Sequence, residues 1–191
     1  MKRLKLAVIT TLLFPALFPA AVAAFGRQQP CFVGIRAQHG IYRIKGEFYV
    51  QAPLDIAWDV LSDYAHISDF VTNVDSSKIL ERRKTTLLIA QKLSGKVFFI
   101  NRSFDLKLLI DERPQEKISF TDISQKSFLI YKGSWELSRV QGQTRVVYRL
   151  KAKPKGWAPW LIGKHAFKSN AEALLKEIRS EIIRREEGKV K

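Results

Sequence analysis

The stretch IYRIKGEFYVQAPLDIAWDVL, residues 41–61, changes its hydrophobic period once, from that of a strand to that of a helix. Residues 41–50 alternate, which predicts a half-buried strand whose inner face carries Tyr42, Ile44, Phe48 and Val50. The strand ends at Gln51-Ala52-Pro53, and proline fits the first turn of a helix. From Ile56 to Tyr64 the apolar residues follow helical spacing, and a second short helix is expected at about 66–71.

Strand patterns fill the chain on both sides of this helical stretch. After Asn73 the apolar residues return to alternation, with turns near Lys84 and at Gln141-Gly142, and strands joined by short turns form an antiparallel meander. We therefore expect a curved antiparallel sheet of six to seven strands. Residues 25–39 are expected to form an N-terminal extension, in which residues 33–37 could add one strand.

A long helix is expected at the end of the chain, over residues 159–187. Its apolar residues recur on one stripe, at Trp160, Gly163, Phe167, Ala171, Leu174, Leu175, Ile178 and Ile182. A stripe of this length needs a large partner, and the sheet is the partner available. The fold class is therefore α+β, with one domain over residues 40–187 and a basic tail at 188–191.

The first 24 residues have the features of a secretory signal peptide. Lys2, Arg3 and Lys5 precede an apolar run over residues 6–22, and Ala21-Val22-Ala23 offers small residues for cleavage. We expect an exported protein, most simply a periplasmic one. The alternative is a retained membrane anchor, which Pro15 and Pro19 within the run disfavour.

Composition points to an anionic partner. The formal net charge is +15, and removing the three basic residues of the leader leaves +12. Outside the cytoplasm the abundant anionic surface is phospholipid or lipopolysaccharide, so peripheral membrane contact is expected and nucleic acid is not. The alternative is a solvated basic surface with no specific partner. Cys31 is the single cysteine, so no intramolecular disulfide can form.

The order of elements and four segments resemble the START-like (helix-grip) superfamily, in particular the bacterial polyketide cyclase/dehydrase and lipid-transport group and its coenzyme Q-binding relatives. The segments are APLDIAWDVLSDYAHISDFVTNV (52–74), SSKILER (76–82), YKGSWEL (131–137) and TRVVYRLKAKP (144–154). The resemblance implies a sheet gripping the long helix around an apolar cavity that holds lipids, sterols, quinones or polyketides. A fully packed core is the alternative, because aromatic-rich faces alone do not distinguish the two.

Several residues are candidates for the wall of such a cavity. The corner formed by the two short helices is part of the cavity rim in the family, which implies roles for Tyr64, Phe70 and Val71. Alternation in 131–137 puts Tyr131 and Trp135 on one face with Gly133, where a glycine lets the strand bend or the helix approach. Tyr148 on the following strand could line the cavity too, or all three aromatics could be ordinary core residues.

Two charged residues fall in phase with apolar ones. Arg102 shares the alternation of Phe104, and Asp122 shares that of Phe120. Because burying an unpaired charge is costly, Arg102 is expected either to pair with Asp122 or to face a polar group of a ligand. A bulge that turns Arg102 to solvent is the remaining alternative.

The start of the final helix combines aromatic and basic residues. Trp157, Trp160 and Phe167 alternate with lysines over residues 153–168. This mixture suits a membrane–water interface, where the protein could dock to exchange a lipid. The alternative is that these aromatics pack on the sheet.

Catalytic and cofactor motifs give no comparable signal. Asp63, His66 and Ser68 form a polar cluster, but on a tight helical corner such groups more simply cap helix ends. The three histidines are scattered, so no metal or other cofactor is expected. Three hypotheses follow: an exported carrier of a lipid, quinone or similar isoprenoid; a cyclase or dehydratase using Arg102, Asp122, Tyr131 or Tyr148; and a basic membrane-surface adaptor.

Overall fold

The computed structural model describes residues 30–97, 100–155 and 159–189, and the side chains of 96–102 and 156–162 are outside the description. The expected leader, Trp157 and the last two residues of the basic tail therefore lie outside the described residues. So do the side chains of Arg102 and Trp160.

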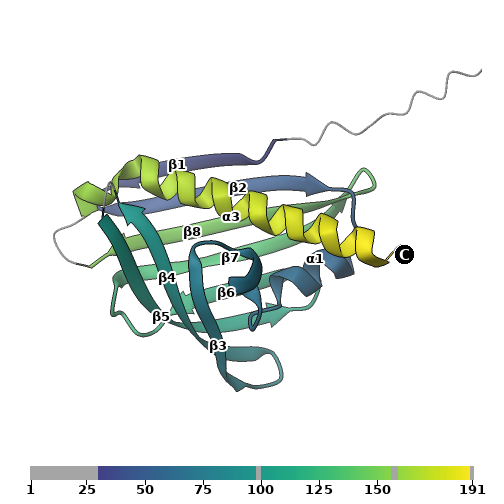
Figure 1. Ribbon diagram of the computed structural model, residues 1–191, viewed down its shortest axis with the longest axis horizontal. Coiled ribbons are helices and arrows are strands. Elements are labelled where there is room, and N and C mark those ends of the chain that lie inside the picture. The colour runs from purple at the N-terminus through teal and green to yellow at the C-terminus, as the bar shows by residue number, and fades with distance from the viewer. Residues whose placement is uncertain (1–29, 98–99, 156–158, 190–191) are drawn as a thin grey trace, which may run out of the picture.

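Eight antiparallel strands form one curved sheet that wraps around the last helix (Figure 1). The strand order is β1-β2-β8-β7-β6-β5-β4-β3. The strands are β1 (Phe32–Gln38), β2 (Ile41–Val50), β3 (Val74–Arg82), β4 (Thr86–Val97), β5 (Ile100–Arg113), β6 (Lys117–Asp122), β7 (Phe128–Val140) and β8 (Gln143–Pro154). The helices are α1 (Leu54–Leu61), α2 (Ile67–Phe70) and α3 (Pro159–Lys189). The expected α+β helix-grip architecture is confirmed, with one strand more than the upper expectation.

Two tight hairpins set the register of β1 with β2 and of β7 with β8. His39 and Gly40 between β1 and β2 both have positive φ, as do Gln141 and Gly142 between β7 and β8. Two positive φ values in a two-residue loop match the twist of paired strands. The turn expected at Gln141-Gly142 is confirmed, and β1 occupies the place where the N-terminal extension could add a strand.

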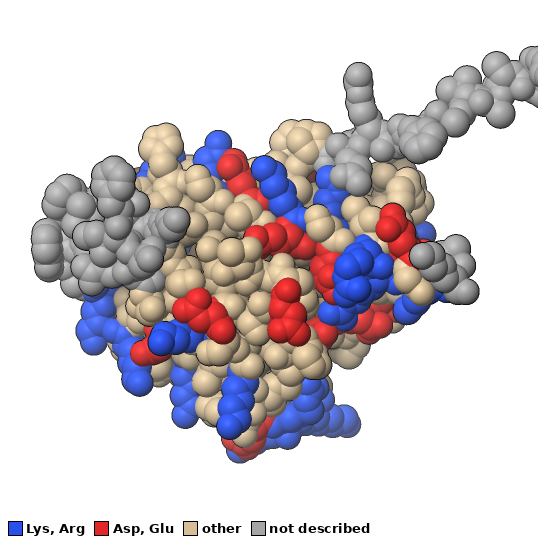
Figure 2. All heavy atoms as spheres, viewed as in Figure 1, with Lys and Arg blue, Asp and Glu red and all other residues tan. Residues whose placement is uncertain are grey.

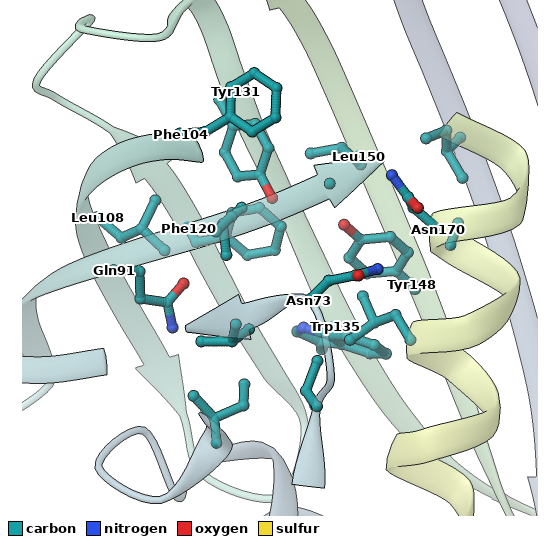
Figure 3. Close-up of a pocket in the computed structure, with 18 of the residues that line it drawn as sticks. Asn73, Gln91, Phe104, Leu108, Phe120, Tyr131, Trp135, Tyr148, Leu150 and Asn170 are labelled. Carbon is teal, nitrogen blue, oxygen red and sulfur yellow. The ribbon is translucent and has the colours of Figure 1, made fainter. Parts of the chain in front are cut away.

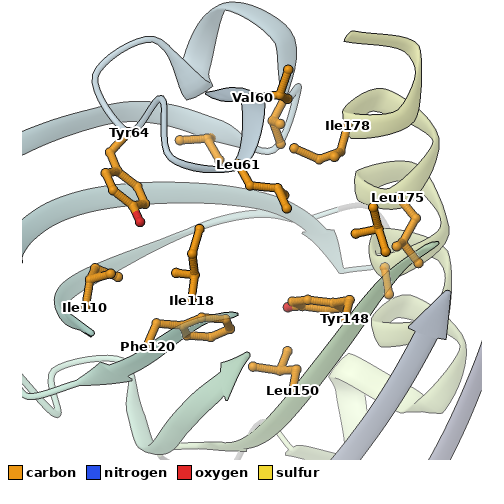
Figure 4. Close-up of a cluster of buried hydrophobic side chains, with 14 of the residues drawn as sticks. Val60, Leu61, Tyr64, Ile110, Ile118, Phe120, Tyr148, Leu150, Leu175 and Ile178 are labelled. Carbon is orange, nitrogen blue, oxygen red and sulfur yellow. The ribbon is translucent and has the colours of Figure 1, made fainter. Parts of the chain in front are cut away.

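The core lies between the concave face of the sheet and two helical elements (Figure 4). Val60 and Leu61 of α1 face Ile178 of α3, while Ile118 and Tyr148 rise from the sheet below. At β2 the helix comes closest: a Cβ atom on Gly46 would lie 2.4 Å from Cδ1 of Leu175. This glycine therefore allows α3 to pack tightly on the sheet.

Two sequence expectations need correction. The final helix is not one continuous stripe, because Gly163 has φ 46 and ψ 151 and bends the chain between Pro159 and Phe167. Gly133 does not serve the approach of the helix. A Cβ atom there would lie 2.0 Å from the backbone oxygen of Arg149 on β8 and 2.6 Å from the Phe120 ring, so its closest neighbours belong to the sheet.

Candidate functional site

A cavity of about 180 Å³ lies between the concave face of the sheet, the α1–α2 corner and α3 (Figure 3). Most of its wall is apolar, from residues that are inward-facing in their strands. The sheet contributes Ile44, Leu93, Phe104, Leu108, Ile110, Ile118, Phe120, Phe128, Tyr131, Trp135, Tyr148 and Leu150, the helices contribute Leu61, Ile67, Phe167, Ala171 and Leu174, and Tyr64 comes from the turn between α1 and α2. The concave face is thus not completely filled by its own side chains.

Six aromatic rings form a continuous wall along one side of the cavity. Neighbouring centroids lie 4.5–6.3 Å apart, within the usual range for aromatic pairs, in the order Phe104, Phe128, Tyr131, Phe120, Tyr148, Trp135. Tyr131 and Trp135 are only half-buried although they point inward. The exposed part of each side chain faces the cavity.

Neutral polar groups interrupt this apolar lining. Asn73, Gln91, Ser94 and Asn170 line the cavity together with the hydroxyl-bearing Tyr131 and Tyr148. Figure 3 shows the hydroxyl groups of Tyr131 and Tyr148 turned toward one another, with the side chains of Asn73 and Asn170 beside Tyr148. Among the described lining residues none is charged, so the cavity can offer hydrogen bonds to a ligand without an opposing charge.

The two tyrosines remain protonated over the physiological pH range. Burial raises the pKa of Tyr131 to about 12, although its hydrogen bond with Tyr148 acts in the opposite direction. Burial also raises the pKa of Tyr148, and the Tyr131 hydroxyl adds to this effect. Each hydroxyl group carries one proton, and the hydrogen bond between the two uses one of them, so the pair can donate one hydrogen bond to a carbonyl or hydroxyl oxygen of a ligand.

The cavity reaches the surface beside Asn170, which lines it and is itself exposed. On the opposite side of this opening lies Gly95 of β4, whose missing Cβ atom would be 3.7 Å from Nδ2 of Asn170 and 3.7 Å from the Phe104 ring. We refer to Asn73, Gly95 and Asn170 as the mouth. Because Gly95 has no side chain, Asn170 of α3 and the Phe104 ring can lie close to β4 at the edge of the cavity.

Polar side chains within residues 62–72 connect the α1–α2 corner to α3. Asp63 accepts hydrogen bonds from Arg185 at 2.8 Å and from His66 at 2.7 Å. Thr72 donates from its hydroxyl group to Glu177 at 2.6 Å. Burial opposes ionisation of Asp63, but the hydrogen bonds from Arg185 and His66 prevail and lower the pKa of its carboxyl group. These contacts hold the α1–α2 corner against α3, and the corner supplies Leu61, Tyr64, Ile67 and Val71 to the cavity wall.

Seven of the eleven residues that the sequence suggested for a ligand site line this one cavity: Tyr64, Val71, Phe104, Tyr131, Trp135, Tyr148 and Phe167. The Tyr64 hydroxyl group is engaged outside it, donating to Glu112 at 2.7 Å. Phe70 packs under the guanidinium group of Arg185, at 5.5 Å, and does not reach the cavity. Arg102 and Trp160 have no described side chain.

The expected pairing of Arg102 with Asp122 is wrong. Asp122 lies opposite Leu108 on β5, six residues from Arg102, a separation of about 20 Å along a strand. Its Oδ1 atom accepts hydrogen bonds from the backbone N–H of Lys107 and from both donors of Ser124. The bulge alternative also fails, because β4 and β5 pair without a register shift and Arg102 lies opposite Gly95.

Sequence reasoning missed the polar part of the lining and two of the six rings of the aromatic wall. Gln91 alternates in phase with Ile89 and Leu93 on the buried face of β4, which is the same signal that singled out Arg102. Phe120 and Phe128 were detectable as inward-facing aromatics. Asn73 and Asn170 gave no signal, because only the tertiary fold brings a loop and a helix to the same opening.

Metal binding and membrane spanning have no support in the described part of the chain. No group of three His, Cys, Asp or Glu side chains comes together there to hold a metal ion. Among the described residues no helix is long and apolar enough to cross a bilayer.

Comparison with known proteins identifies the family. Residues 50–179 match the family model described as polyketide cyclase / dehydrase and lipid transport. A comparison with the curated proteins found no match.

Solved structures with the same fold include both enzymes and lipid-transfer proteins. The Zhui aromatase/cyclase from a Streptomyces species superposes with a TM-score of 0.66 at 17% identity, over 76% of this chain and 95% of that one. A STAR-related lipid transfer protein from Xanthomonas axonopodis gives 0.59 at 16% identity, over 81% and 99%. Human STARD10 gives 0.63 at 14% identity, over 82% and 75%. At these identities the likeness establishes the fold alone.

The family model covers most of the gripping sheet and all of the cavity wall except Ile44, and its description combines the two activities found among the structural neighbours. The chain therefore belongs to the polyketide cyclase/dehydrase and lipid transport family, within the START-like superfamily.

Proposed function

We propose that this protein binds and carries an apolar ligand with an uncharged polar end, such as a lipid, a quinone of the coenzyme Q type or a similar isoprenoid. The observation that carries the proposal is the lining of the cavity, which is apolar except for neutral hydrogen-bonding groups at Asn73, Gln91, Tyr131, Tyr148 and Asn170. Burial of apolar ligand surface would drive binding, at about 25 cal/mol per Å². The neutral groups would orient the polar end.

The size of the cavity limits how the ligand fits. A volume of about 180 Å³ exceeds the roughly 150 Å³ of an apolar cavity that binds benzene, but it is below the 300–1,000 Å³ of typical ligand pockets. One aromatic ring or a short stretch of chain would be enclosed. The rest of a longer ligand would pass the mouth at Gly95 and Asn170, or the α1–α2 corner would move away from α3.

We also propose that the protein acts outside the cytoplasm and touches an anionic membrane. Export rests on the basic head, apolar run and small-residue site in residues 1–24. Membrane contact rests on the strongly basic composition. Membrane contact would keep such a carrier at the surface of a bilayer, so the three parts of the proposal are consistent with each other.

Native mass spectrometry tests ligand carriage. The delipidated protein would be mixed with a total bacterial lipid extract, repurified and sprayed intact. We expect a one-to-one adduct with an uncharged apolar molecule, and its loss in Leu93→Phe, which adds a ring inside the cavity. Bare protein in repeated loadings, from extracts that contain both phospholipids and quinones, would contradict the proposal.

A cyclase or dehydratase acting on a polyketide-like substrate is the second candidate. The facing hydroxyl groups of Tyr131 and Tyr148 favour it, because a hydrogen-bonded pair with one free donor in an apolar cavity could stabilise charge that develops on a substrate carbonyl oxygen. Turnover of a linear poly-β-ketone analogue, followed by the absorbance of the cyclised product, would test it. Activity that is lost in Tyr131→Phe and Tyr148→Phe, with ligand retention unchanged, would favour the enzyme over the carrier.

A further inference from the structure

A row of basic residues crosses four neighbouring strands on the convex face, the face of the sheet turned away from α3. Arg36 of β1 lies opposite Arg43 of β2, Arg43 opposite Lys151 of β8, and Lys151 opposite Lys132 of β7. Adjacent strands are about 4.8 Å apart, so four cationic side chains stand side by side. We call Arg36, Arg43, Lys151 and Lys132 the basic row.

The basic row has no acidic partner. None of its four members forms an ion pair with any residue that the structure describes, whereas other cations on the same face of the sheet are neutralised. There Glu47 binds Lys45 and Arg145, and Glu136 binds Lys117 and Arg149. Like charges directly opposite each other in a sheet are destabilising, so the fold itself gains nothing from this row.

The same row becomes apolar in the other half of the sheet. Lys132 lies opposite Thr121, Thr121 opposite Leu109, and Leu109 opposite Leu88. All five large hydrophobic side chains that are exposed in the described chain occupy outward positions of the sheet or the adjoining turn: Phe32, Leu80, Leu109, Ile123 and Leu129, at 43–55% exposure. Lys78 and Lys107 stand among them, opposite Ala90 from either side.

The two halves together fit one kind of partner. Lysine and arginine beside exposed aliphatic side chains suit the boundary of an anionic bilayer, where cations meet phosphate groups and apolar side chains enter the headgroup region. Single-stranded nucleic acid is bound by aromatic stacking platforms, and four of the five exposed apolar residues are aliphatic. On the face around α3, acidic and basic side chains are interspersed (Figure 2), whereas the four members of the basic row stand next to one another.

We infer that the convex face is a docking surface for an anionic phospholipid membrane, with the basic row as its electrostatic half and Leu109, Ile123 and Leu129 as its apolar half. This takes up the membrane contact proposed above and assigns it to a surface, while ligand binding in the cavity does not depend on it. Docking by this face leaves the mouth at Asn170 on the other side of the sheet, free to meet a donor or acceptor of the ligand.

Vesicle sedimentation tests the inference. The parent protein should bind vesicles of phosphatidylcholine with phosphatidylglycerol, bind vesicles of phosphatidylcholine alone far less, and lose binding as salt is raised. Replacing two cations, in Lys132→Gln/Lys151→Gln, should weaken binding to the anionic vesicles about 30-fold. The matched control Lys164→Gln/Lys176→Gln removes the same charge from exposed positions of α3 and should change binding less than about threefold. All variants keep residues 1–29, so that segment contributes equally to each.

Three outcomes would overturn the inference. Equal weakening by the two double variants would mean that net charge acts without a surface. Weakening by the α3 pair alone would place docking at the start of the final helix. Binding of an oligonucleotide that is sensitive to Lys132→Gln/Lys151→Gln, together with indifference to vesicles, would assign the row to nucleic acid. Unfolding curves of the Lys132→Gln/Lys151→Gln variant should show no loss of stability, because like charges are removed, and native mass spectrometry should still detect a cavity ligand.

Discussion

The two faces of the sheet carry side chains of opposite character, although the same strands form both. On the concave face, inward-pointing residues such as Phe120, Trp135 and Tyr148 are apolar and aromatic, yet they leave a hollow. On the convex face, outward-pointing residues of the same strands include four cations in a row without acidic partners. Neither feature helps the protein to fold: a hollow forgoes packing, and aligned cations repel. Each face therefore points to a molecule outside the chain.

Within the concave face, the packed region around Gly133 differs from the hollow, and Gly133→Ala should destabilise the protein strongly. The new Cβ atom would lie 2.0 Å from the backbone oxygen of Arg149, which cannot move without breaking strand pairing. We expect the free energy of unfolding in urea to fall by about 3 kcal/mol or more.

Gly95→Ala is the matched control at the mouth. Its Cβ atom would meet only ordinary contacts at 3.7 Å, so the free energy of unfolding should change by less than about 0.5 kcal/mol. Equal losses at Gly133 and Gly95 would mean that the concave face is uniformly packed.

Two leucine substitutions compare a position beside the cavity with a position in the packed core. Leu93→Phe adds volume beside the cavity, and its cost should stay below about 1 kcal/mol because the ring can enter the hollow. Leu137→Phe adds the same volume to a buried position that does not line the cavity, and should cost about 1–3 kcal/mol. Thermal or urea unfolding measures both, and a larger loss for Leu93→Phe would reverse the assignment of filled and empty regions.

On the convex face, removing a positive charge and removing a negative charge should change the free energy of unfolding slightly and in opposite directions. Lys151→Gln relieves repulsion from Arg43 and Lys132, so the protein should become more stable by a few tenths of a kcal/mol. Glu136→Gln removes the partner of Lys117 and Arg149 and should cost about 0.5 kcal/mol. Both changes should shrink in high salt, and an Lys151→Gln variant that loses stability would show that the basic row serves the fold after all.

The ion pair between His66 and Asp63, in the α1–α2 corner, should have only a small effect on stability. The hydrogen bond to Asp63 raises the pKa of His66 above its ordinary value. Since the folded-state pKa is the higher one, protonation favours the folded state: the contribution is complete below the unfolded pKa of about 6.5 and is lost as pH rises through the folded value. An NMR titration should find the His66 pKa raised in the parent protein and lowered toward its ordinary value in Asp63→Asn. An identical titration in both proteins would rule out this contact.

Local pattern was enough to predict most of the fold and much of the cavity wall. Alternation in residues 41–50 assigned Tyr42, Ile44, Phe48 and Val50 to the buried face, and all four are buried. The same reasoning found Tyr131, Trp135 and Tyr148, because a period of two determines the face on which a side chain lies.

What the pattern could not give is the pairing between distant strands. Arg102 and Asp122 both fall on an inward phase, but only the register shows that they lie six positions apart. The basic row is invisible in the sequence for the same reason, since Arg36 and Lys151 become neighbours of Arg43 only through strand pairing. Periodicity also cannot reveal a hollow, because an inward aromatic residue looks the same whether its ring is packed or faces empty space.

Xenon binding shows whether the concave face encloses a hollow, and it does not depend on which ligand the protein carries. Apolar cavities of this size accept xenon, whereas close-packed cores do not. Crystals of the parent protein under xenon pressure should show a strong anomalous peak among Phe120, Trp135 and Tyr148, and Leu93→Phe should weaken or remove it. A parent protein with no xenon between the sheet and α3, at a pressure that fills apolar cavities of similar volume in other proteins, would contradict the account of the concave face as a ligand site.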